Sequence, residues 1–238
     1  MLHSTREYQM IRNMNTRRSL YIICLLLLSA VGNKLDAQTV VKPVRQQNDS
    51  TSHALIHQIG FDVRPGYVAP TNSFLEGDNA QRQKIDRSLS LHLKYAFQFS
   101  KDSYLGRLYP HAYQGIGVSH NTFYNSAELG NPVAVYAFQG APIVRFSSRL
   151  SLDYEWNFGA SFGWKQYDEH SNWYNDAIGS KINAYINLGF VLNWQFYPQW
   201  KLAAGVDFTH FSNGNTRYPN GGLNTIGGRV GIGRTFNA

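Results

Sequence analysis

Apolar and polar residues alternate along three long segments of this chain. In residues 150–164 every second position, beginning with Leu150, carries an apolar, aromatic or alanine side chain, and the positions between carry polar residues or glycine. Residues 89–99 and 182–196 repeat the pattern. A period of two places the apolar side chains on one face of a β-strand. Segments this long exceed the roughly five or six residues of most soluble-protein strands and suit a tilted membrane crossing, which needs about 9 to 11 residues.

Weaker versions of the same alternation recur along the rest of the chain. They cover residues 55–68, 112–121, 132–146, 200–212 and 223–236. About eight strands is the smallest standard number for an outer-membrane barrel. Helical periodicity is absent outside the N-terminal segment, which argues against a helical or α/β enzyme. The sequence therefore predicts an all-β fold, an eight-stranded antiparallel transmembrane β-barrel over residues 53–238.

Composition indicates which face of the strands meets the membrane. The polar faces carry glycine, serine, asparagine and scattered charge, which suit a narrow hydrated lumen, and the apolar faces carry Trp and Tyr near the strand ends. A soluble lipocalin-like barrel would turn the same apolar faces inward, and the period alone leaves this alternative open. The last strand ends near Phe236 and resembles the aromatic C-terminal strand that the outer-membrane assembly machinery recognises.

Connection lengths give the expected orientation. Outer-membrane barrels have short periplasmic turns and longer outer loops. The predicted outer loops are residues 69–86, 122–131, 165–181 and 213–222. The inner connections at 147–149 and 197–199 are short, whereas the one at 100–110 is longer.

The first 37 residues are typical of a secretory signal peptide. Arg17 and Arg18 precede an apolar run from Leu20 to Val31, and Ala37 offers a cleavage point before Gln38. The run is shorter than the roughly 20 residues of a transmembrane helix. Met14 is an alternative start. We expect a polar periplasmic leader over 38–52 and export to the outer membrane of a Gram-negative cell.

Cysteine and charge exclude several functions of the mature chain. The only cysteine, Cys24, lies inside the signal segment, so disulfides, thiolate nucleophiles and cysteine-ligated metals are excluded. Without residues 1–37 the chain keeps 17 basic and 13 acidic residues, a net charge of +4. The chain has no run of Lys and Arg residues that would suggest nucleic-acid binding. The positive balance is compatible with an anionic lipopolysaccharide surface.

Three polar residues interrupt the apolar face near the C-terminus. His210 and Ser212 are two positions apart and share the parity of Phe208 and Val206, so both should face lipid at the outer end of their strand. Asn224 shares the parity of the apolar residues of the following strand, so it should face lipid beside them. The sequence predicts one exterior polar patch.

This combination suits nucleophilic catalysis. A histidine can take the proton of a serine hydroxyl near neutral pH, and a third group normally orients the ring. Asn213, Gly214 and the loop from Pro219 to Gly222, which contains Asn220, could supply N–H donors to an oxyanion. Alternatively, His210 and Ser212 are polar residues at the headgroup level with no chemical role.

The run His210-x-Ser212-Asn213, followed by Pro219-Asn220 and a glycine, resembles the lipid A 3-O-deacylase family known as PagL, eight-stranded outer-membrane barrels of the acyloxyacyl-hydrolase type. The motif resemblance is specific only over about 205–236. It implies that His210 is the base, that Ser212 is the nucleophile and that Asn213 helps to form the oxyanion hole. The implied reaction removes an ester-linked (3-O) acyl chain from the lipid A of lipopolysaccharide in the outer leaflet, without a cofactor or a metal.

Asn224 departs from the family pattern. It occupies the position at which the best-studied members carry a glutamate that orients the histidine. An amide can hold the ring but cannot neutralise an imidazolium, and replacing the triad acid of a serine protease by its amide costs about 10⁴ in turnover. Asp207 has the wrong parity to act in its place.

Other assignments remain as alternatives. A non-catalytic structural, adhesive or small-channel barrel would use the loops 69–86 and 165–181 as binding surfaces. The glycine-rich run 227–233 lacks the strand-to-helix context of a nucleotide loop and is better explained by close strand packing. His57, His92, His111 and His120 have no ligand spacing and are expected in the lumen or at the interface. The sequence leaves open whether two barrels pair as a homodimer.

Overall fold

The structure is a computed structural model that describes residues 55–236. The predicted signal peptide over 1–37, with Met14 and Cys24, and the predicted leader over 38–52 lie outside the described residues. The described part falls within the predicted barrel domain.

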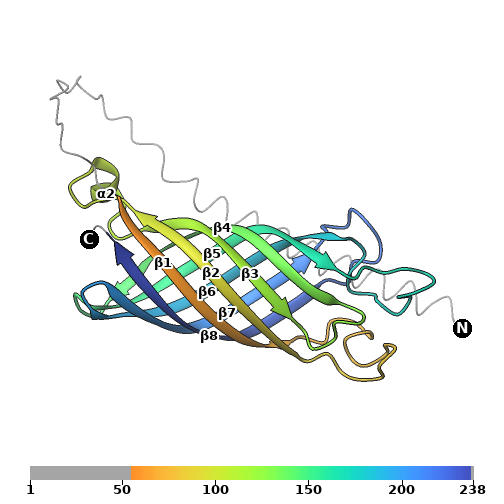
Figure 1. The fold of residues 1–238 in the computed structure, drawn as a ribbon. Coiled ribbons are helices and arrows are strands. Elements are labelled where there is room, and N and C mark those ends of the chain that lie inside the picture. The colour runs from red at the N-terminus through yellow and green to blue at the C-terminus, as the bar shows by residue number, and fades with distance from the viewer. Residues whose placement is uncertain (1–54, 237–238) are drawn as a thin grey trace, which may run out of the picture. The chain divides into compact units, whose positions relative to one another are not determined.

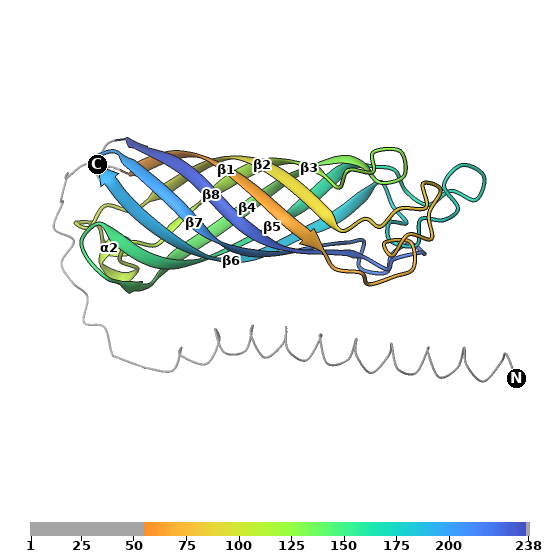
Figure 2. The ribbon, with the colours of Figure 1, turned by 90° about the horizontal axis from the view of Figure 1, so that it is seen from below.

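Eight antiparallel strands close into a barrel, in which consecutive strands pair and β1 also pairs with β8 (Figures 1 and 2). The strands are β1 Ile56–Val68, β2 Arg87–Gln98, β3 Tyr113–Thr122, β4 Gly130–Arg145, β5 Leu150–Trp164, β6 Ile182–Tyr197, β7 Trp200–Ser212 and β8 Leu223–Phe236. They run from 10 residues in β3 to 16 residues in β4 and β6, long enough to cross a bilayer at a tilt. The predicted fold class is confirmed.

The surface of the barrel is apolar and its interior is polar. Leu93, Phe158 and Val230 on the outside are 54%, 58% and 64% exposed. Their inward-facing neighbours in the chain, such as Asn157 and Arg229, are only 1% and 2% exposed. A soluble protein does not present a continuous apolar surface of this kind to water, whereas a lipid bilayer covers it. The lipocalin-like alternative, with the apolar faces inward, is therefore wrong.

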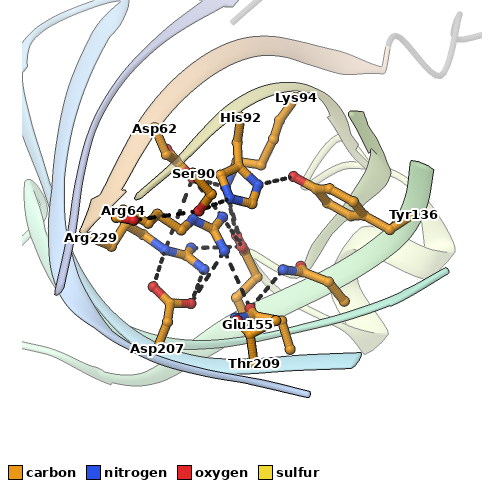
Figure 3. A network of polar contacts seen from close by, with 12 residues as sticks. Asp62, Arg64, Ser90, His92, Lys94, Tyr136, Glu155, Asp207, Thr209 and Arg229 are labelled. Carbon is orange, nitrogen blue, oxygen red and sulfur yellow. Dashed lines mark hydrogen bonds and ion pairs between the residues drawn. The ribbon is translucent and has the colours of Figure 1, made fainter. Parts of the chain in front are cut away.

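Charged side chains from five strands meet inside the barrel and form what we call the ion network (Figure 3). Its members are Asp62 and Arg64 of β1, Lys94 of β2, Glu155 of β5, Asp207 of β7 and Arg229 of β8. The Arg229 guanidinium donates to Asp207 and Glu155 at 2.6 Å each. Buried charges are tolerated only when they are paired and hydrogen-bonded, and here three acids face three bases.

An apolar cluster fills the barrel at the end with the long loops. It joins inward side chains at the strand ends to side chains of the loops: Val68, Phe74, Leu75, Ile85, Phe123, Leu129, Trp164, Ile178, Phe211 and Leu223. The Trp164 ring stacks on Phe123 at 5.6 Å between centroids and meets the Phe211 ring edge-on at 5.1 Å. We call this cluster the outer plug. It and the ion network occupy the lumen at two levels.

The inward position of Trp164 differs from the alternation in the sequence, which places it on the apolar outer face. Along β5 the alternation continues to Phe162, which is 42% exposed, but Trp164 is 5% exposed. Gly163 has a φ of +87°, and the register with β4 shifts between Gly130 and Val133. At this bulge the positive φ of Gly163 departs from extended strand geometry, so the alternation of faces along β5 ends there and Trp164 points into the lumen.

The connections differ in length at the two ends of the barrel. Four long loops, 69–86, 123–129, 165–181 and 213–222, gather at one end, and short turns at 146–149 and 198–199 lie at the other. By the rule for outer-membrane barrels these are the outer and periplasmic ends. The longer periplasmic connection contains a short helix, α2 Tyr104–Leu108, capped by Ser103, which the absence of helical periodicity did not predict. Among residues 55–236, no helix is long and apolar enough to cross a membrane.

Candidate functional site

His210, Ser212 and Asn224 meet on the outer face of the barrel at its outer end. In the β7–β8 ladder His210 is the direct partner of Asn224. The residues that follow His210 and precede Asn224, Phe211 and Leu223, point inward into the outer plug and are 1% and 0% exposed. Because parity alternates along a strand, burial of these two apolar anchors fixes the outward direction of the polar residues beside them.

The three side chains form a hydrogen-bonded chain. The Nδ1 atom of His210 lies 2.7 Å from Oδ1 of Asn224, and its Nε2 atom lies 2.9 Å from Oγ of Ser212. An amide oxygen can only accept, so Nδ1 carries the ring proton. In the neutral ring Nε2 is then free to accept the hydroxyl proton of Ser212. This is the arrangement of a serine nucleophile, a histidine base and a group that orients the base.

The surroundings of this His–Ser–Asn cluster are apolar on the side of the membrane core. Ile186 of β6 lies opposite His210 in the β6–β7 ladder and is 43% exposed. Phe208 and Ile226, which pair with each other one step deeper along β7 and β8, are also exposed. His210, Ser212 and Asn224 are themselves half-buried. A lipid chain that follows the barrel wall would therefore reach the cluster over an apolar surface.

The loop 213–222 is held in place by backbone hydrogen bonds. Gly221 and Gly222 donate their N–H groups to the carbonyls of Asp176 and Ala177 in the neighbouring loop, at 2.9 and 3.0 Å. Their N–H groups are therefore engaged, so this part of the predicted donor loop does not face an oxyanion. The two contacts tie the loop that follows Ser212 to the rest of the outer end.

The amide groups of the predicted oxyanion residues also brace this loop. The backbone N–H of Asn213 donates to Oδ1 of Asn220 at 3.0 Å, and the Asn213 side chain donates to the Arg217 carbonyl at 2.7 Å. Asn220 donates from Nδ2 to Asn215 at 3.3 Å. The N–H of Gly214, which has a φ of +64°, has no hydrogen-bond partner among residues 55–236. Of the predicted donors, Gly214 and Asn220 each keep a backbone N–H without a hydrogen-bond partner among residues 55–236.

Gly222 lies against the histidine ring, a contact for which no pattern in the sequence was a signal. A Cβ atom at this position would lie 3.3 Å from Cε1 of His210 and 3.3 Å from the carbonyl oxygen of Phe211. Gly222 also has a φ of +70°, a conformation that favours glycine. The absence of a side chain here leaves the ring room to sit between Asn224 and Ser212.

We expect Gly222→Ala to lower the turnover of any reaction at this cluster by about tenfold, because small displacements of a catalytic group are costly and the new methyl presses on the ring. Steady-state kinetics of the folded variant would measure this. Gly77→Ala is the matched control, since Gly77 has a φ of +112° but an added Cβ would meet nothing closer than 3.6 Å. Equal losses in both variants would mean that backbone strain alone is responsible.

The other polar residues considered from the sequence lie elsewhere. Asp207 points into the lumen, where it pairs with Arg229, as its parity predicted. His92 is buried in the lumen, where it contacts the hydroxyls of Tyr136 and Ser90 (Figure 3). In the glycine-rich run, a Cβ at Gly227 would overlap the backbone of β1 at Pro65, so close strand packing explains that glycine.

Several solved outer-membrane barrels are similar to this chain. Neisserial surface protein A shares 8% identity with a TM-score of 0.48, covering 76% of this chain and 97% of its own. The outer-membrane enzyme PagL shares 12% identity with a TM-score of 0.44, covering 72% and 97%. The N-terminal barrel domain of OprF from Pseudomonas aeruginosa shares 10% identity with a TM-score of 0.42, covering 76% and 97%. No curated protein matches the chain in sequence.

The family comparison covers most of the barrel. The model of the family described as "Lipid A 3-O-deacylase (PagL)" matches residues 89–233, which run from β2 to β8 and include the whole His–Ser–Asn cluster. The match spans more than half of the chain. The chain therefore belongs to the PagL lipid A 3-O-deacylase family, and its barrel is an outer-membrane protein.

Proposed function

We propose that this barrel hydrolyses the 3-O ester of lipid A with Ser212 as the nucleophile, His210 as the general base and Asn224 as the group that orients the histidine. The observation that carries the proposal is the hydrogen-bonded chain from Asn224 through the His210 ring to the Ser212 hydroxyl, at 2.7 and 2.9 Å, on a lipid-facing surface. Polar side chains on the lipid-facing wall of a barrel are costly, because apolar side chains in their place would contact lipid. Their presence on this wall therefore favours a functional role.

The reaction follows from the proton positions. Ser212 Oγ attacks the ester carbonyl while His210 Nε2 takes the hydroxyl proton, and a tetrahedral oxyanion forms. The backbone N–H of Gly214 is the proposed donor to this oxyanion, because the backbone and side-chain amides of Asn213 already donate within the loop. Collapse of the intermediate releases the sugar hydroxyl, which receives the proton from His210. Water, deprotonated by the same ring, then cleaves the acyl–Ser212 ester, so the products are a fatty acid and a lipid A with one acyl chain fewer.

The position of the cluster suits this substrate. β7 runs toward the outer end, so His210 and Ser212 lie at the level of the outer leaflet, where the sugar esters of lipopolysaccharide are found. The acyl chain would lie along the apolar wall below, on Ile186, Phe208 and Ile226. The sugar would stand above it, next to the loop 213–222.

The filled lumen disfavours the channel alternative. Arg229 and Glu155 in the ion network are 2% exposed, and Phe211 and Leu223 in the outer plug are 1% and 0% exposed. An ion or solute that crossed the barrel would have to displace the side chains of both the ion network and the outer plug. A structural or adhesive role for the outer loops remains the competing proposal, and it predicts no change in lipid A.

The direct test is mass spectrometry of lipid A after incubation with the purified, refolded protein. We expect loss of the mass of one 3-hydroxyacyl chain and release of the corresponding free fatty acid. Lipid A that keeps every acyl chain, with a protein that is shown to be folded, would leave the non-catalytic alternative. Release of an acyl chain from a position other than 3-O would correct the site of cleavage and keep the chemistry.

Asn224 offers a sharper test of the proposed orientation. We expect Asn224→Asp to raise turnover by about tenfold, because a carboxylate stabilises the imidazolium and a hydrogen bond to a charged group contributes about 1.5–3 kcal/mol instead of about 0.5–1.5 kcal/mol. The acid limb of the kcat/KM profile should also move to higher pH. Asn131→Asp, which adds the same charge at an exposed outer position, should leave both unchanged. A variant Asn224→Asp with lower turnover and an unshifted profile would contradict the orienting role.

A further inference from the structure

A cavity of about 350 Å³ occupies the periplasmic half of the barrel. Its walls come from the periplasmic ends of the strands, among them Ile56 of β1, Gln98 of β2 and Thr235 of β8. Pro198 and Ser148 of the short turns lie at its mouth, and Asp62, Glu155 and Arg229 of the ion network form its floor. We call this cavity the vestibule. Its volume is at the lower end of the range of small-molecule sites, about 300–1,000 Å³.

The charges of the vestibule are not balanced. The ion network at the floor pairs three acids with three bases and is neutral. Beyond the floor, the described residues that line the vestibule carry four basic side chains and one carboxylate, Asp153. The four are Lys101 of the connection 99–112, Arg145 of β4, Arg149 of the turn and Lys201 of β7. None of them forms an ion pair with a carboxylate among residues 55–236.

Three of the four basic side chains act on the same residue, His111. His111, which also lines the vestibule, lies in the periplasmic connection. Partial burial, and then the positive charges of Arg145, Lys101 and Lys201, lower its pKa below the usual value. No carboxylate offsets these three charges at His111. Like charges that converge destabilise one another, and Asp153 is the single carboxylate beside these four basic side chains in the described lining, so an anion that entered the vestibule would reduce the remaining repulsion.

Asp153 supplies a second requirement for the occupant. Its Oδ2 atom accepts a hydrogen bond from Asn193 at 2.8 Å, but its Oδ1 atom is buried and has no partner. Asp153 is 4% exposed and lines the vestibule. A buried carboxylate oxygen without a donor costs free energy, which a ligand that donates a hydrogen bond would recover. The site therefore fits an anion that also carries a donor.

We propose that the vestibule binds a phosphate group, held by Lys201, Arg145 and Lys101 and donating a hydrogen bond to Asp153. Inorganic phosphate is both anion and donor near neutral pH, because H2PO4⁻ and HPO4²⁻ each keep a P–OH group, whereas a phosphate monoester, with a second pKa of about 6, has mostly lost its own. Two sources share this chemistry: a soluble phosphate of the periplasm and the headgroup of a phospholipid in the inner leaflet, whose neighbouring hydroxyl or ammonium would be the donor. The proposal is independent of the reaction at Ser212, which lies at the other end of the barrel.

The test is a calorimetric titration of the intact refolded barrel, in a phosphate-free detergent, with inorganic phosphate. We expect saturable binding that weakens at least tenfold in Lys201→Gln and in Arg145→Gln, since each removes a hydrogen bond between charged groups. Lys181→Gln and Arg87→Gln, which remove the same charge from exposed positions at the outer end, should bind as the parent does.

Further experiments test whether the ligand must donate a hydrogen bond, and they distinguish a soluble phosphate from a phospholipid headgroup. Sulfate, which lacks the donor at neutral pH, should bind at least tenfold more weakly than phosphate, and Asp153→Asn should reduce this preference. Native mass spectrometry with added phosphatidylglycerol identifies the source: lipid adducts lost in Lys201→Gln indicate a headgroup, and their absence indicates a soluble phosphate. No saturable binding, or equal weakening by the outer-end controls, would overturn the proposal.

Discussion

Ser212→Ala should abolish deacylation, with a loss of at least about 10⁴ in turnover, because the substitution removes the atom that forms the acyl-enzyme. The hydroxyl makes one side-chain contact that the structure describes, to His210 at 2.9 Å, so its removal should leave the barrel folded. The measurement is the rate of fatty-acid release from lipopolysaccharide, with folding followed by the shift in electrophoretic mobility between unheated and heated samples. KM should change little, since the hydroxyl contributes to the transition state more than to binding.

The matched control for this variant is Ser171→Ala. Ser171 is exposed in the loop 165–181, and within the described part of the chain its hydroxyl bonds only to Asp168, so its loss should change turnover less than twofold. His210→Gln should reproduce most of the loss in Ser212→Ala, and the double variant should be no slower than either alone, because the two residues act as a unit. Additive losses, or a Ser212→Ala barrel that deacylates at the parental rate, would mean that another group is the nucleophile.

Arg229→Leu should lower the free energy of unfolding by about 3–5 kcal/mol, the usual cost of leaving buried charges without a partner. Arg229 is 2% exposed and bonds both oxygens of Asp207, at 2.6 and 2.9 Å, and one oxygen of Glu155, at 2.6 Å. Its loss leaves the ion network with three acids and two bases. Urea unfolding of the barrel inserted in vesicles, followed by tryptophan fluorescence, measures the change.

Two further variants separate burial from charge. Arg87→Leu removes an arginine whose side chain is 81% exposed and whose ion pair with Asp86 is 3.7 Å long, so the expected loss is within about 1 kcal/mol. The double variant Arg229→Leu, Glu155→Leu restores the charge balance of the network and should recover part of the stability lost in Arg229→Leu. A double variant that is less stable than the parent by the sum of the two single losses would show that the network charges are not coupled.

The strand pattern and the direction of the candidate site could both be predicted from the sequence, because each depends on local geometry. Alternate side chains of a strand point to opposite faces wherever the strand is placed, so a period of two located all eight strands and put His210, Ser212 and Asn224 on the lipid side. Long strands and unequal connections then indicated a membrane barrel. Where a bulge at Gly163 broke the period, the prediction for Trp164 was wrong.

Contacts between distant strands were decided by the tertiary structure. Which charges meet in the lumen depends on the stagger between all the strand pairs around the closed barrel, and no single segment encodes that sum. Closure therefore set the pairing of Arg229 with Asp207 and Glu155, and it gathered Lys101, Arg145 and Lys201 around the vestibule. It also brought Gly222 against His210. The alternation of the chain determined which way each side chain faces, and only the closed barrel determined what it faces.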